Sequence, residues 1–206
     1  MNIERWSELM VAFGFVANED TFRSLVAAYS EKHRHYHTLE HIRACLQHLD
    51  ICAAQTNERK EVELALWFHD AIYRPLSGKN EQKSADWATS FLSSNFSRQD
   101  VAARVHRLVM VTEHNAPTKT KDESILVDID LSILGSDADT YDTFEKAVRM
   151  EYQTIPMFMY RKRRVEVLSG FLKRPCIYQN EPFQSEREQQ ARVNLSNAIS
   201  KLSAHA

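Results

Sequence analysis

Glycine and proline are scarce in this chain of 206 residues, which holds four of the former and five of the latter. Folds built from many tight turns need more of both, because these residues supply the backbone conformations of turns. Long apolar runs are missing too, and none approaches the roughly 20 residues of a membrane-spanning helix. The first ten residues carry Glu4, Arg5 and Glu8 in place of the apolar stretch of a secretory signal. These absences predict a helical, cytoplasmic protein without a membrane partner.

Cysteine is also rare, and its arrangement does not indicate disulfides. Cys45 and Cys52 lie seven residues apart on one face of an expected helix, and Cys176 stands alone. An odd number without a signal peptide is typical of a reducing compartment, where buried thiols behave as small apolar residues. A strong excess of one charge is missing as well, because the net charge is -2. We therefore expect no nucleic-acid polymer and no acidic membrane as a partner.

Apolar residues recur at intervals of three and four along almost the whole chain, which is the helical period. We expect an all-α bundle of nine or ten helices. Their approximate ranges are 6–13, 22–29, 38–55, 62–73, 81–92, 97–114, 125–134, 137–150, 156–174 and 185–202. The length predicts a single domain over residues 1–206. Its metal-site core would span about 33–135, with the C-terminal helices 137–204 packing on it.

Three polar groups stand out against apolar surroundings. Five of the nine histidines fall in one short stretch that includes His37 and His41. A helix starting at this point would place both imidazoles on one face, because they are four residues apart. His69 and Asp70 end the most apolar segment, where an imidazole and a carboxylate are costly unless paired or coordinated. The third group is a pair of aspartates inside the apolar run 127–131.

The run 125–134 is rich in Ile, Val and Leu, which are favoured in strands. We predict a helix there, because Asp128 and Asp130 would otherwise lie on a buried strand face. Each polar group alone has an ordinary explanation as a surface histidine or a helix cap, but their coincidence indicates a metal site. Imidazole and carboxylate ligands together suit Mn²⁺, Fe²⁺ or Zn²⁺, and Mg²⁺ less well. One or two such ions would activate water for hydrolysis.

The order of these groups resembles the HD superfamily of metal-dependent phosphohydrolases, which are all-helical. The matching residues, in chain order, are His41, His69, Asp70 and Asp130. Tyr36-His37 with His41 is similar to the YHxxxH element of cyclic-nucleotide phosphodiesterases, a branch of this superfamily. Likewise, Asp130-Leu131-Ser132 is similar to their Ala-Asp-Leu-Ser element. The resemblance implies that the four matching residues bind metal, that His37 protonates the leaving group, and that Asp130 rather than Asp128 is the distal ligand.

The whole chain resembles small bacterial proteins described as predicted HD-superfamily phosphohydrolases. The shared features are Arg34-x-Tyr36-His37, Asn80-Glu81 followed by Ser84-Ala85, and the stretch 128–135. Two features of the phosphodiesterases are missing: a further histidine shortly after His69-Asp70, and a glutamine-bearing nucleobase pocket. Cyclic nucleotides are therefore not implied, and we expect a small phosphorylated substrate.

Further residues are candidates for a second ion or for the substrate. Asp70 would bridge two ions about 3.5–4 Å apart, as in other two-metal sites. The remaining candidates for the second ion or the substrate are Glu81, His114 and Asp128. Arg34 and Arg164 are the candidates for binding phosphate, because a guanidinium binds it through two hydrogen bonds.

Two other functions fit parts of the sequence. His37 to His41 reads H-x-x-E-H, the inverted zinc-peptidase motif in which both histidines bind Zn²⁺ and Glu40 is the base. That function leaves His69-Asp70 and Asp130 without a role. Alternatively, the metal is a structural staple, or the domain senses nucleotides without catalysis. A structural site is coordinatively closed, whereas a catalytic one keeps a position open.

Overall fold

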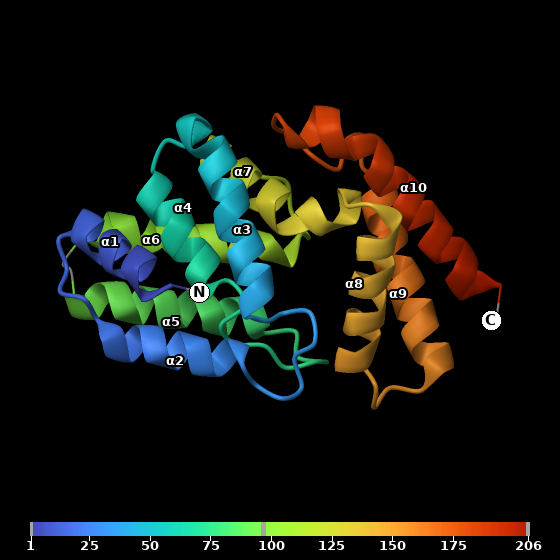
Figure 1. Ribbon diagram of the computed structural model, residues 1–206, viewed down its shortest axis with the longest axis horizontal. Coiled ribbons are helices and arrows are strands. Elements are labelled where there is room, and N and C mark those ends of the chain that lie inside the picture. The colour runs from blue at the N-terminus through green and yellow to red at the C-terminus, as the bar shows by residue number, and fades with distance from the viewer. Residues whose placement is uncertain (1, 96–97, 205–206) are drawn as a thin grey trace. The chain divides into compact units, whose positions relative to one another are not determined.

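The computed structural model describes residues 2–95 and 98–204, and every regular element within these ranges is a helix (Figure 1). The α-helices are α1 (Ile3–Phe13), α2 (Glu19–Tyr29), α3 (Leu39–Cys52), α4 (Arg59–Phe68), α5 (Asn80–Asn95), α6 (Gln99–Met110), α7 (Lys121–Asp130), α8 (Ala138–Glu151), α9 (Met157–Leu172) and α10 (Phe183–Ser203). Short 3₁₀ helices are η1 (Ala53–Gln55), η2 (Val111–Glu113) and η3 (Leu131–Gly135). The prediction of an all-α fold is confirmed, including a helix rather than a strand at 125–134.

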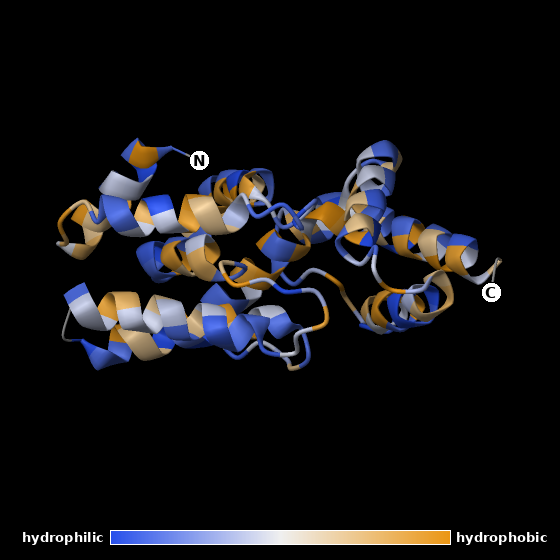
Figure 2. Cartoon of the chain, turned by 90° about the horizontal axis from the view of Figure 1, so that it is seen from below, coloured by the Kyte–Doolittle hydropathy of each residue, from blue (hydrophilic) through white to orange (hydrophobic). Residues whose placement is uncertain are grey.

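The chain divides into two compact units, one up to Val127 and one from Asp128. In the first unit α4 is the central helix and packs against α1, α3, α5 and α6. All of its residues from Glu61 to Phe68 are buried, as its apolar sequence predicts. Along the other helices, hydrophobic residues (orange in Figure 2) are interspersed with hydrophilic residues (blue).

Local signals in the sequence account for several helix ends. Gly14 follows α1 with a φ of 77°, a left-handed conformation that glycine adopts without steric cost. Thr38 precedes α3, and its side chain accepts a hydrogen bond from the backbone N–H of Glu40. Asp137 caps α8 in the same way, through the N–H of Thr140. None of the helices in the described ranges is long and apolar enough to cross a membrane.

The end of the central helix differs from the prediction. The central helix was expected to reach Tyr73 but ends at Phe68, because the following backbone is held by side chains rather than by its own helix. The N–H of Ile72 donates to Ser84 Oγ at 3.0 Å, and that of Arg74 donates to Asn80 Oδ1 at 3.1 Å. The expected start of the helix 97–114, at Ser97, lies outside the described residues.

The second unit begins inside α7 because the last turn of this helix is hydrogen-bonded to the segment that precedes α10. The buried Asp128 carboxylate accepts the backbone N–H groups of Gln179 and Asn180, at 2.9 and 2.7 Å. The following η3 packs against α8 and α10, and α9 also packs against α10. Residues from Asp128 onwards belong to the second unit, together with the C-terminal helices.

Candidate metal centre

His69 is held in one orientation by the end of the central helix. Its backbone N–H continues the helical pattern by donating to the carbonyl of Ala65 at 2.8 Å. Its ring Nδ1 lies 2.9 Å from the carbonyl oxygen of Leu66, which can only accept a hydrogen bond. A ring that carries its proton on Nδ1 toward this carbonyl leaves the Nε2 lone pair for a metal ion. This is the usual arrangement of a metal-binding histidine.

The Nε2 atom of His69 faces two other potential ligands. The Nε2 atoms of His41 and His69 are 3.1 Å apart. Asp70 Oδ2 lies 3.1 Å from the His69 Nε2 atom and 3.7 Å from that of His41. Two ligands about 2.1 Å from one ion are about 3.0 Å apart at a right angle and about 3.4 Å apart at a tetrahedral angle. These three residues therefore have the spacing of neighbouring ligands of one metal ion.

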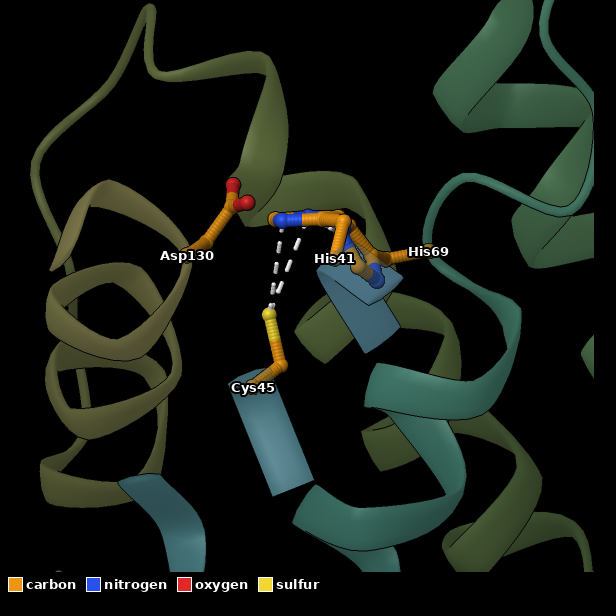
Figure 3. A group of neighbouring side chains, drawn as sticks. All are labelled: His41, Cys45, His69 and Asp130. Atoms are coloured by element: carbon orange, nitrogen blue, oxygen red, sulfur yellow. Dashed lines mark hydrogen bonds between the residues drawn. The ribbon is translucent and has the colours of Figure 1, made fainter. Parts of the chain in front are cut away.

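Cys45 and Asp130 complete a group that can hold a metal ion. One ligand atom from each of His41, Cys45, His69 and Asp130 lies within 4.8 Å of the others (Figure 3). Asp130 is the last residue of α7, whose first turn is fixed at the start of α4. There Asp122 accepts the backbone N–H groups of residues 57 and 58, at 2.7 and 3.0 Å. The group contains Asp130 and not Asp128.

Cys45 is the one member of the group that the sequence did not suggest. It was predicted to be a buried apolar thiol on α3, and it is indeed buried, with 1% of its surface exposed. It also follows His41 by four residues, so both side chains lie on one face of the helix. This spacing of four residues from His41 was the feature of the sequence that could have indicated Cys45 as a ligand.

His37 lies beside the group but not on the same helix as His41. Because α3 begins at Leu39, close to the expected start at residue 38, His37 belongs to the preceding loop, and the two imidazoles do not share one helix face. The His37 ring stacks on Tyr73, with centroids 4.2 Å apart, and lies edge-on to His41 at 6.1 Å. It is half-buried.

Glu40 faces away from this arrangement. It is exposed and pairs with Arg43 at 2.8 Å on the surface of α3. The inverted peptidase motif needs both histidines on one helix and the glutamate directed at the metal. With His37 in the loop, the geometry does not fit the peptidase alternative.

Arg34 has a different role from the predicted phosphate ligand. Its side chain is fully buried and lies between the rings of Tyr29 and Tyr73, at 5.1 and 5.5 Å. The guanidinium donates to the backbone carbonyls of Asp70 at 2.7 Å, Ala71 at 3.0 Å and residue 37 at 3.2 Å. Arg34 therefore joins the loop before α3 to the backbone that follows α4, and so positions two sides of the site.

Glu81, one candidate for a second ion, shares an electrostatic environment with the site. Burial raises the pKa of its carboxyl group, and the negative charges of Asp70 and Glu113 raise it further, while His114 acts in the opposite direction. His114 has a φ of 55°, a left-handed conformation that is uncommon for residues other than glycine. Glu81 thus lies within electrostatic reach of Asp70, and His114 lies within electrostatic reach of Glu81.

The other two candidates have structural roles in the second unit. Asp128 is completely buried, and it also accepts a hydrogen bond from the Asn180 side chain at 2.8 Å. Its carboxylate anchors the segment before α10, so it is not available as the predicted second-ion ligand. Arg164 pairs with Glu145 at 2.6 Å and stacks over Phe144 at 5.3 Å. It joins α8 to α9, which replaces its predicted role in phosphate binding.

No protein-family model, no curated protein and no solved structure matches this chain. The resemblance to the HD superfamily therefore stays a prediction from the quoted motifs. The geometry by itself shows a His-Cys-His-Asp group that can hold a metal ion of unassigned type, with Asp70 beside it.

Proposed function

We propose that the chain is a metal-dependent phosphohydrolase in which His41, His69, Asp70 and Asp130 bind the metal. The observation that carries the proposal is the approach of Asp70 Oδ2 to both imidazole Nε2 atoms, at 3.1 and 3.7 Å. Two imidazole nitrogens and a carboxylate oxygen at this spacing suit a divalent cation. A bound ion would polarise a phosphoryl oxygen and lower the pKa of coordinated water towards roughly 7.

The surroundings of Asp70 support catalysis over a purely structural role. Its side chain is 16% exposed, whereas those of His41 and His69 are 4% and 1% exposed. Of the three side chains, the carboxylate of Asp70 is therefore the one most open to solvent. A catalytic metal site needs such an accessible position, while a structural site is closed by protein ligands.

His37 is placed to act as the general acid. Its ring is next to the group without belonging to it, and stacking on Tyr73 holds the ring in place. Imidazole exchanges a proton near neutral pH. His37 would donate that proton to the oxygen of the departing group, as the phosphodiesterase resemblance implies.

The proposal is tested with protein purified without chelator, analysed for metal, and assayed on phosphomonoesters, phosphodiesters and nucleotides with Mn²⁺. We expect Asp70→Ala to abolish turnover. Glu40→Gln is the matched control in the neighbouring segment, and it should leave both metal content and turnover unchanged. Stoichiometric metal with no turnover on any phosphate compound would overturn the proposal.

The role of His37 has its own test, based on the leaving group. A nitrophenolate leaves without protonation, whereas an alkoxide needs a proton. We expect His37→Gln to retain metal and to slow hydrolysis of alkyl phosphates about tenfold or more beyond its effect on nitrophenyl phosphates. Equal slowing of both substrates would show that His37 is not the acid.

A non-catalytic metal site is the second candidate function, and the presence of Cys45 in the group favours it. Four protein ligands from His41, Cys45, His69 and Asp130 would close the coordination sphere. In that case Asp70→Ala would retain the metal fully. Loss of metal in this variant would favour the phosphohydrolase.

A further inference from the structure

We propose that Cys45 binds the metal as a thiolate and makes the site selective for Zn²⁺ over Mn²⁺ and Mg²⁺. This inference rests on the proposed function only in sharing the metal ligands His41 and His69. It adds a ligand that the HD resemblance does not contain, and it assigns the class of metal.

The first support is the position of the thiol on α3. Cys45 Sγ lies 3.7 Å from Nε2 and 3.8 Å from Nδ1 of His41, one helical turn earlier. Sulfur and nitrogen ligands of one tetrahedral zinc ion are about 3.6 Å apart, because Zn–S is about 2.3 Å and Zn–N about 2.1 Å. The thiol therefore lies at the distance of a fellow ligand (Figure 3).

The second support is the contrast with the other cysteine of the same helix. Cys52 is equally buried, with 1% of its surface exposed. Its thiol donates to the carbonyl of His48 at 2.8 Å, a common contact of a helical cysteine with the preceding turn. Cys45 instead lies within 4.8 Å of the ligand atoms of two histidines and an aspartate. The two thiols thus differ in surroundings while sharing helix, burial and chemistry.

The chemistry of the donor set determines the metal. A thiolate is a soft ligand that favours Zn²⁺, whereas Mn²⁺ and Mg²⁺ favour oxygen ligands. A buried thiol gains its negative charge on metal binding, and the ion compensates the cost of burying that charge. With Cys45 as a ligand, two imidazoles and one thiolate match a zinc site better than a magnesium site.

The experiment uses Co²⁺ in place of Zn²⁺, because cobalt bound to a thiolate absorbs strongly in the near ultraviolet. We expect this band in the wild-type protein and in Cys52→Ser, and its loss in Cys45→Ser. We also expect Cys45→Ser to weaken Zn²⁺ binding at least tenfold while changing Mn²⁺ binding less than about threefold. Circular dichroism checks that each variant is folded.

X-ray absorption of the zinc-loaded wild-type protein gives an answer that does not depend on any variant. Scattering from one sulfur atom in the first shell supports the proposal, and a shell of nitrogen and oxygen alone overturns it. A cobalt band that persists in Cys45→Ser also overturns it. Phosphohydrolase activity without the cobalt–thiolate band would contradict only the assignment of Cys45 as a ligand. The cobalt–thiolate band without phosphohydrolase activity would contradict only the proposed function.

Discussion

Replacing Arg34 by methionine would remove the guanidinium that joins the loop before α3 to the backbone after α4. Three backbone carbonyls, one in a buried and two in partly buried hydrogen bonds, would lose their donor, with N···O distances of 2.7, 3.0 and 3.2 Å in the wild-type protein. A buried polar group left unsatisfied costs about 1 kcal/mol or more. Glu31, the fourth partner, would keep its pair with Arg74 at 2.8 Å. We therefore expect a loss of about 3 kcal/mol in the free energy of unfolding.

Chemical denaturation measures this loss directly. In thermal unfolding, about 1 kcal/mol corresponds to about 2–4 °C for a chain of this size, so the midpoint should fall by roughly 6–12 °C. Arg74→Met is the matched control, because that side chain is 58% exposed and contacts the same Glu31. An exposed ion pair contributes about 1 kcal/mol or less. The loss in the free energy of unfolding of Arg34→Lys should lie between those of Arg34→Met and Arg74→Met, since an ammonium lacks the planar guanidinium group that donates to all three carbonyls.

Metal binding provides a second measurement on the same variant. Arg34 holds the backbone of Asp70, so its loss should weaken metal binding by about tenfold, as other residues that orient metal ligands do. The reasoning is refuted if Arg34→Met unfolds within about 1 kcal/mol of the wild type and only raises the KM for a phosphorylated substrate. That result would restore the phosphate-binding role predicted from the sequence.

Two further predictions concern stability away from the site. Gly135→Ala should destabilise the second unit markedly, because an added Cβ would lie 2.6 Å from the Cβ of Arg187 and 2.7 Å from its backbone oxygen. Gly170→Ala in α9 is the control: its added Cβ meets no atom within 4 Å, so this variant should be neutral or more stable by about 1 kcal/mol. Equal denaturation curves for the two variants would contradict this prediction. Hydrogen bonding to Arg98 lowers the pKa of Asp100 to about 2, so this carboxylate contributes stability above its unfolded pKa and loses it as the pH falls from about 4 to 2. An NMR titration of Asp100 near pH 4, or no change in Arg98→Gln, would contradict the second prediction.

The helices were predictable because apolar residues recur along most of the chain at intervals of three and four. Local signals add to this, such as Gly14 after the end of α1 and Thr38 before the start of α3. The early end of α4 was not predictable, because it depends on Ser84 and Asn80, whose side chains bind its downstream backbone from another helix. Such partners are distant in sequence and leave no periodic pattern. Helix boundaries that depend on tertiary hydrogen bonds are therefore the part of the fold that could not be predicted from the sequence.

The site residues divide in the same way. His41 and His69 stood out because a polar group in apolar surroundings needs a partner, and the structure brings them together. The two aspartates of α7 could not be distinguished by that argument, since both have apolar neighbours. Asp128 turns out to satisfy the backbone N–H groups of residues 179 and 180, which only the folded chain shows. Cys45 escaped notice because a buried cysteine is ordinary unless its neighbours are known.

The two proposals share His41 and His69, so the variants that separate them are those of Asp70 and Cys45. If Asp70→Ala loses the metal and Cys45→Ser keeps it, the site is the carboxylate-rich one that phosphate hydrolysis needs. If the reverse holds, the thiolate closes the coordination sphere and the site is structural. If both variants lose the metal, the ion has a thiolate on its buried side and Asp70 on its accessible side. That combination would support hydrolysis by a zinc-selective site, because the accessible carboxylate leaves room for substrate.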